Sequence, residues 1–195
     1  MARASPVREV RRNTSRIRKN SPGAGVTRPV VFGNMGWNIN ILHIGPTRQG
    51  SDGLLRLSDE HRVDPIGDHD ERAWAHISDA GITVISRSFF APDRIEMLAG
   101  PGTAVTHLVI GSTGGAYVLE AYRDGSLVRR LIEIDTGEGN EDMGEPLPGE
   151  DSVEETHGED KFFALFKAVT GVDNLDFLGY AELTLVASPE LVERF

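Results

Sequence analysis

Three apolar runs separated by short turns set the architecture that this chain can adopt. The runs are TAVTHLVIG (103–111), AYVLEAY (116–122) and LVRRLIEI (127–134). They are rich in β-branched and aromatic residues, and the turns between them are STGG and Arg-Asp-Gly-Ser. Asp-Gly favours a two-residue hairpin turn, because both central positions need a positive φ. The sequence therefore predicts an antiparallel meander of three strands.

The region before the meander predicts a strand followed by a helix. WNINILHI (37–44) alternates and ends at Gly-Pro, which is typical of a strand. Further on, Ala73, Trp74, Ile77 and Ala80 recur at helical spacing. The spacing predicts an amphipathic helix between Asp68 and Ala80, with Asp68 or Asp70 as N-cap and Gly81 as the stop.

Four further segments complete the predicted elements. ITVISRSFF (82–90) reads as a strand, PDRIEMLA (92–99) as a short helix and AELTLVAS (181–188) as a last strand. In DKFFALFKAVTG (160–171) one helical face carries Phe162, Leu165, Phe166 and Val169, Thr156 with Glu159 can form a capping box, and Gly171 ends the helix.

The predicted order, β-α-β-α-β-β-β-α-β, indicates an α+β fold. We expect a largely antiparallel sheet with a central three-strand meander and helices packed on one face. A chain of 195 residues can bury one core of the usual domain size. A single domain over residues 35–195 follows.

The first 34 residues form a basic arm. Residues 1–29 carry eight Lys or Arg side chains against Glu9 alone, although the whole chain has a net charge of −10. The arm lacks apolar periodicity, so we expect it to be disordered. It can serve as a nucleic-acid arm through Arg11, Arg12, Arg16, Arg18 and Lys19, or as a transit peptide. The competing interpretations are a tail without function, or upstream sequence if translation starts at Met35. Elsewhere the acidic balance opposes nucleic-acid binding.

Composition limits the cellular compartments and partners that we expect for this chain. Cysteine is absent, which removes disulfides and thiolate metal sites and fits a reducing cytoplasm. No apolar run approaches the ~20 residues that a membrane span needs. We therefore expect a cytoplasmic protein with no membrane partner and no cofactor.

Twelve Asp or Glu residues and no Lys or Arg lie between Leu131 and Asp160, here called the acidic segment. Its spacing misses the calcium-loop pattern, because D-T-G-E-G-N departs from D-x-[DN]-x-[DN]-G. Prolines and glycines favour an irregular surface connection. The segment predicts a solvated surface that can face a basic protein partner, with these candidate contact residues: Glu138, Glu141, Asp142, Glu145, Glu150 and Asp151.

A second polar cluster, DEHRVDPIGDHDER (59–72), offers ligands to a transition metal. The candidates are His61, Asp64, Asp68 and His69, and GDHDE distantly resembles an element of binuclear metallophosphoesterases. The D-x-H and G-H-x-H elements of those enzymes do not occur here. The competing interpretation is a loop that leads to a helix N-terminus, where aspartates are favoured.

Two other patterns are weaker indications of chemistry. GSTGGA (111–116) lacks the lysine and the following helix of a phosphate-binding loop, so a hairpin turn is expected there. His43 and His107 lie within predicted strands, where a satisfied core histidine is commoner than a catalytic base.

Three segments, MGWNINILHI, DGSLVRRLIEI and DMGEPLPGE, resemble a family of small acidic actinobacterial proteins with a domain of unknown function. Such proteins begin Met-Gly before a first strand and carry Asp-Gly-x-Leu-Val-Arg followed by Gly-Glu-Pro-Leu and a glutamate. The similarity covers the first strand and residues 116–171, and Gly149 stands where an aromatic commonly precedes the glutamate. The resemblance implies a start at Met35 and no particular activity; an immunity-like role follows only by analogy.

Three functional hypotheses result. The first is a non-enzymatic cytoplasmic interaction domain that uses the acidic segment. The second is a metal-dependent hydrolase that uses the 61–69 cluster, in which the ion would lower the pKa of bound water. The third is nucleic-acid binding through the basic arm.

Overall fold

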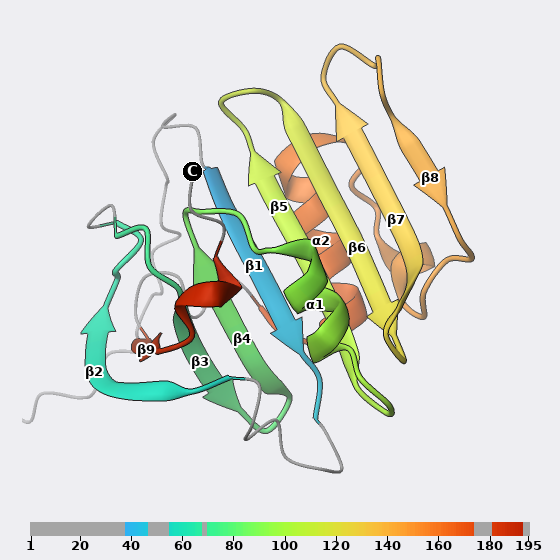
Figure 1. Cartoon of the computed structure of the whole chain (residues 1–195). Helices are drawn as coiled ribbons and strands as arrows, with labels where there is room; N and C mark the ends of the chain where they lie inside the picture. The colour runs from blue at the N-terminus through green and yellow to red at the C-terminus, as the bar shows by residue number, and fades with distance from the viewer. Residues whose placement is uncertain (1–37, 47–54, 68–69, 174–180, 193–195) are drawn as a thin grey trace, which may run out of the picture. The chain divides into compact units, whose positions relative to one another are not determined.

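The computed structural model describes residues 38–46, 55–67, 70–173 and 181–192, which build a nine-stranded antiparallel sheet (Figure 1). The strand order is β2-β9-β3-β4-β1-β5-β6-β7-β8. The strands are β1 (Asn38–Ile44), β2 (Leu57–Val63), β3 (Trp74–Ser78), β4 (Gly81–Ser86), β5 (Ala104–Gly111), β6 (Ala116–Arg123), β7 (Ser126–Ile134), β8 (Glu141–Met143) and β9 (Glu182–Val186). The helices are α1 (Pro92–Leu98) and α2 (Gly158–Thr170), with short 3-10 turns η1 (Glu150–Ser152) and η2 (Pro189–Leu191).

Strands β5, β6 and β7 are the three apolar runs of the sequence, and they pair antiparallel in chain order. The turn between β6 and β7 has positive φ at Asp124 (50°) and Gly125 (74°), as the Asp-Gly pattern predicts. These strands stand sixth to eighth in the sheet, whereas β1 is its middle strand. The sheet therefore extends well beyond the meander on the β1 side.

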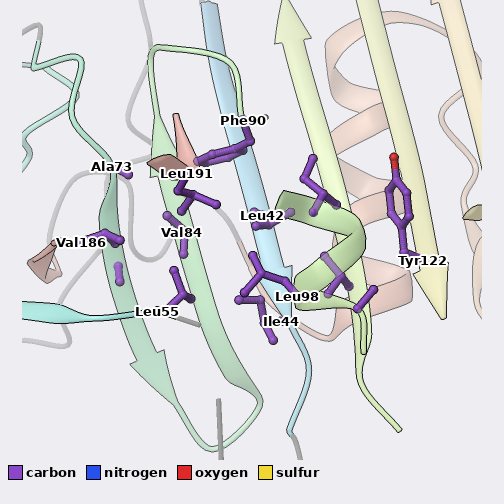
Figure 2. Close-up of a cluster of buried hydrophobic side chains, with 14 residues drawn as sticks. Leu42, Ile44, Leu55, Ala73, Val84, Phe90, Leu98, Tyr122, Val186 and Leu191 are labelled. Carbon is purple, nitrogen blue, oxygen red and sulfur yellow. The ribbon is translucent and has the colours of Figure 1, made fainter. Parts of the chain in front are cut away.

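The two helices cover opposite faces of the sheet. Alternate residues of β1 point to opposite faces, so Ile41 packs with Phe166 of α2, while Leu42 packs with Leu98 of α1. Figure 1 shows α1 in front of the sheet and α2 behind it, and Figure 2 shows Leu42, Leu98 and Tyr122 in the cluster on the α1 side. The expected arrangement, with the helices on one face, is not what the structure has.

The helix expected between Asp68 and Ala80 is absent from the described part of that span, so that prediction was wrong. Instead, Trp74–Ser78 forms β3, which pairs antiparallel with β4 through a two-residue turn at Asp79 and Ala80. Residues that would share a helical face now separate: Trp74 is fully buried, and Ile77 is 57 % exposed.

Pairing with distant strands explains why β3 overrides the helical pattern. One edge of β3 bonds β4, and the other bonds β9, where Trp74 stands opposite Leu185. A helix of about 12 residues is marginal alone, so a ladder on both edges outweighs its local propensity. The partner β9 lies more than a hundred residues further along the chain. A pattern read from a short window of sequence cannot include it.

Helix α2 ends as predicted but begins differently. Gly171 adopts a left-handed conformation with φ of 73°, and its N–H bonds Lys167 O. The predicted Thr156–Glu159 capping box does not form, because the N-cap is His157 and makes no side-chain cap bond. The Gly158 N–H instead donates to the Glu133 carboxylate of β7, at 2.5 Å. A carboxylate from the sheet thus replaces the local cap.

Two strands arise in segments whose sequences predicted loops. Residues 59–63 belong to β2, which pairs with β9, and residues 141–143 form β8, which pairs with β7. Both are the outermost strands of the sheet and carry mostly polar residues, which is how natural proteins protect sheet edges.

Within the described residues, neither helix has the length and hydropathy that crossing a membrane requires.

Candidate functional site

Arg129 of β7 is the side chain around which the acidic segment is organised. It is only 3 % exposed. Its Nε and Nη2 donate to the Glu150 carboxylate at 3.0–3.2 Å. Its Nη1 donates to Asp142 and to the carbonyl oxygens of Met143 and Gly144, the latter two at 3.0 and 3.2 Å. Arg129 of β7 therefore bonds both β8 and η1.

Glu150 is a structural residue in this arrangement. Its side chain is 7 % exposed, and besides Arg129 it accepts a bond from the Leu147 N–H at 2.9 Å. Burial by itself would lower the pKa of Arg129, but the bonds to Glu150 and Asp142 raise it above the ordinary arginine value. The buried guanidinium consequently stays charged and paired.

A second anchor, Glu133, joins the two ends of the acidic segment. Glu133 of β7 accepts bonds from Lys161 Nζ at 2.7 Å and from the Gly158 N–H. Burial would raise the pKa of Glu133, yet the bonds from Lys161 and Gly158 lower it. Arg129 thus ties the middle of the segment to β7, and Glu133 of β7 ties its last residues to the start of α2.

Most carboxylates of the acidic segment remain exposed between these anchors. Eight of the twelve are in the exposed class: Asp135, Glu138, Asp142, Glu145, Asp151, Glu154, Glu155 and Asp160. Of the predicted contact residues, Glu138, Glu145 and Asp151 are exposed, and Asp142 is exposed although it bonds Arg129. Glu141 is half-buried and lies 3.9 Å from Arg130, whereas Glu150 is withdrawn into the Arg129 pair.

The role of Arg129 was missed at the level of sequence, although a signal exists. In LVRRLIEI an arginine must occupy the same strand face as Leu131, because side chains alternate along a strand. A charged group on a face that a helix covers needs a buried partner. The acid-rich segment directly downstream could have been proposed to supply the partner of this arginine.

A second polar cluster lies on the α1 side of the sheet and centres on Glu120. Tyr122 Oη donates to Glu120 at 2.9 Å, Arg130 Nε donates at 2.8 Å, and His107 Nδ1 lies 3.3 Å away. The Phe90 ring packs edge-on to His107 with 5.8 Å between the ring centroids. Registry explains the cluster, because His107, Glu120 and Arg130 stand opposite one another on β5, β6 and β7.

The pKa values of Glu120 and Tyr122 lie far from neutral pH, which is unfavourable for proton transfer. Burial alone would raise the pKa of Glu120, but the bonds from His107, Tyr122 and Arg130 lower it to about 2. Burial, reinforced by the Glu120 charge, raises the pKa of Tyr122 well above its ordinary value. A general acid or base works best with a pKa near the operating pH, so neither group suits that task. The cluster fits a structural role.

The two strand histidines are both buried. His43 is 4 % exposed, and its Nδ1 lies 3.0 Å from Thr83 Oγ1, which makes it the satisfied core histidine that the sequence predicts. Burial lowers the pKa of His43 to about 4. His107 is 6 % exposed and is bonded through Nδ1, while its Nε2 has no hydrogen-bond partner among the described residues.

Only half of the predicted metal cluster can be placed. His61 Nδ1 lies 3.1 Å from Thr184 Oγ1, and Asp64 accepts a bond from the Gly67 N–H at 2.9 Å. Asp68 and His69 lie outside the described residues. In the portion of the chain that the structure describes, no three His, Asp or Glu side chains are grouped as metal ligands. The metal site stays a prediction, as does nucleic-acid binding by the arm at residues 1–34, which is also outside that portion.

The surroundings of the metal candidates are rich in arginine. Arg72 bonds both Asp70, at 2.7 Å, and Glu60, at 3.0 Å, and its guanidinium lies over the Trp74 ring at 5.1 Å from the centroid. The bond from Arg72 lowers the pKa of Asp70. Arginine already neutralises these acids, and its charge repels a cation, so this environment disfavours a metal site.

Comparison of the chain with family models, with curated proteins and with solved structures found no match. The resemblance to the actinobacterial family therefore remains a prediction, and a function must be inferred from the residues of the site.

Proposed function

We propose that this chain is a non-enzymatic protein-interaction domain whose acidic segment binds a basic partner. One observation carries the proposal: eight exposed carboxylates lie on a segment without Lys or Arg, Arg129 holds the middle of that segment, and Glu133 joins its two ends. A surface that is already ordered loses less conformational entropy when a partner binds. A concentration of one charge also steers an oppositely charged partner and accelerates association.

The setting that we propose is the cytoplasm, since a chain without cysteine gains nothing from an oxidising compartment. An immunity-like partnership, in which an acidic protein masks a basic one, is the form of this function that the family resemblance suggests. The pKa shifts of Glu120 and Tyr122 support a role without catalysis at that cluster.

The test is capture of basic proteins by the immobilised domain at low and high salt, about 50 mM and 500 mM, with mass-spectrometric identification. Exposed charges are screened beyond roughly 10 Å at 0.1 M salt, so we expect binding at low salt that falls steeply at high salt. The triple variant Glu138→Gln/Glu145→Gln/Asp151→Asn should lose the captured partner.

A matched control separates the location of charge from net charge. The triple variant Asp59→Asn/Asp79→Asn/Glu190→Gln removes the same number of exposed carboxylates elsewhere on the domain and should retain the partner. Equal loss in both triple variants, or no basic protein recovered at low salt, would reject the proposal.

A further inference from the structure

A row of apolar side chains lies on the α1-side face of the sheet, outside both hydrophobic clusters. Val109 of β5 stands opposite Val118 of β6, which stands opposite Ile132 of β7. All three are half-buried, and none belongs to or packs against either cluster. We call them the open row.

The opposite face of the same three strands shows what such a row can accept. Directly behind the open row, Leu108, Leu119 and Leu131 form the matching row, and α2 covers it through Phe162 and its neighbours. Figure 1 shows α1 in front of the other end of β5 and β6, while no described helix crosses the end where the open row lies. An amphipathic helix thus covers the α2-side face of these three strands. In the described structure, no helix covers the open row on the other face.

The open row meets the acidic segment on its β8 side, where Arg130 of the same face lies 3.9 Å from Glu141. Glu141 of β8 stands opposite Ile132 and so ends the row on that side. Glu138 lies in the turn that follows β7 and is exposed. The open row therefore meets the acidic segment at β8 and at the turn before it, whereas the anchors Arg129 and Glu133 lie on the α2 face of β7.

We propose that the open row binds an amphipathic basic helix of the partner, an inference that rests on the proposed function and specifies its partner. Three neighbouring strands span about 10 Å, which matches the width of a helix with its side chains. The apolar face of such a helix would lie on Val109, Val118 and Ile132, as in other helix-in-groove complexes. Its Lys or Arg side chains would lie toward Glu141 and Glu138.

The probe is a synthetic 18-residue peptide of leucine and lysine with helical amphipathic spacing. A peptide of the same composition, scrambled to remove the apolar face, controls for charge. We expect the amphipathic peptide to bind at least about tenfold more tightly than its scrambled isomer, a difference of about 1.4 kcal/mol. The variant Val118→Thr/Ile132→Thr should remove that preference, since threonine keeps the β-branched shape and adds a hydroxyl.

A matched variant and a spectroscopic readout complete the test. Ile77→Thr/Val63→Thr changes two apolar residues that are each 57 % exposed elsewhere and should leave binding unchanged. In the unmodified protein, the peptide should shift the backbone amide NMR signals of Val109, Val118 and Ile132, a result that needs no variant to fold.

The outcomes distinguish this inference from the proposed function. Equal binding of both peptides, weakened only by the Glu138/Glu145/Asp151 neutralisation, would overturn the helix site and support the acidic surface. Binding of neither peptide would overturn both. Amide shifts confined to residues away from the open row would also overturn the helix site.

Discussion

The guanidinium of Arg129 and the carboxylate of Glu150 form a buried ion pair, with Nη2 3.0 Å from Oε2 and both side chains under a tenth exposed. The pair joins a strand of the sheet to the 3-10 turn η1 inside the acidic segment. A charged pair in such a place is costly to break, because the surviving partner stays buried without compensation. The order of the acidic surface therefore depends on a residue that contributes no negative charge to it.

The first prediction concerns this pair. Arg129→Met should lower the free energy of unfolding by about 3–5 kcal/mol, because Glu150 is left buried and unpaired. Arg129→Met/Glu150→Met should recover part of the loss by removing the stranded charge. Urea denaturation measures both. Arg62→Met is the control: this arginine is 44 % exposed in its pair with Glu60, so its loss should cost no more than about 1 kcal/mol. Equal effects of the Arg62 and Arg129 substitutions would contradict the structural role.

The second prediction tests the β3–β4 hairpin. Gly81 has φ of 131°, and an added Cβ there would clash with the carbonyl oxygen of Ile44, only 2.1 Å away. Gly81→Ala should therefore destabilise the protein well beyond the roughly 1–2 kcal/mol that a positive φ alone costs an alanine. Gly102→Ala provides the matched control, since Gly102 also has a positive φ (74°) but nothing lies within 4 Å of its added Cβ. If thermal unfolding showed the same change for both, the close approach of β1 and β4 would be in doubt.

The third prediction is a pH dependence from His43. Its pKa is about 4 in the folded protein, against 6.5 for an unperturbed histidine, so protonation favours the unfolded chain between these values. The associated stability is fully present above pH 6.5 and decreases as the pH falls toward 4. From about pH 7 to pH 5 the loss should be about 2 kcal/mol. His43→Gln should reduce the difference between chemical denaturation curves at the two pH values; an unchanged difference would rule out His43 as its source.

The fourth prediction concerns the stability of the protein in acid and its dependence on Glu120. The pKa of Glu120 is lowered from 4.5 to about 2, so its contribution to stability is present above pH 4.5 and is lost as the pH falls toward 2. Between about pH 4.5 and pH 3 the loss should be about 1.5 kcal/mol. Glu120→Gln should be less stable at neutral pH and should show a shallower dependence on acid over this interval. A parallel dependence in the variant and the unmodified protein would place the acid sensitivity elsewhere.

Prediction from sequence succeeded where a local pattern and its structural requirement coincide. The β6–β7 turn needs positive φ at two adjacent positions, and Asp124-Gly125 supplies them. Helix α1 begins at Pro92 as predicted, and α2 ends at a left-handed Gly171. In each case the deciding interactions lie within a few residues, so a short window contains them.

The candidate site could be predicted only in part. The acidic segment was found because its charge is a property of composition, and the exposure of Glu138, Glu145 and Asp151 agrees with the expected surface. The sequence could not show that Glu150 is buried while those three residues are exposed, because only the fold brings Glu150 to Arg129. The open row likewise depends on strand register, which decides that Val109, Val118 and Ile132 align.

By itself, the sequence determined the local elements with strong turn and helix-end signals, the acidic character of residues 131–160 and the absence of cysteine. The tertiary structure decided that Trp74 lies on a strand, that α1 and α2 cover opposite faces, and that Glu133 rather than Thr156 meets the start of α2. The physical reason is the distance along the sequence over which each interaction acts. Turn and capping preferences act over a few residues, whereas strand pairing and buried charge pairs are satisfied by partners from distant parts of the chain.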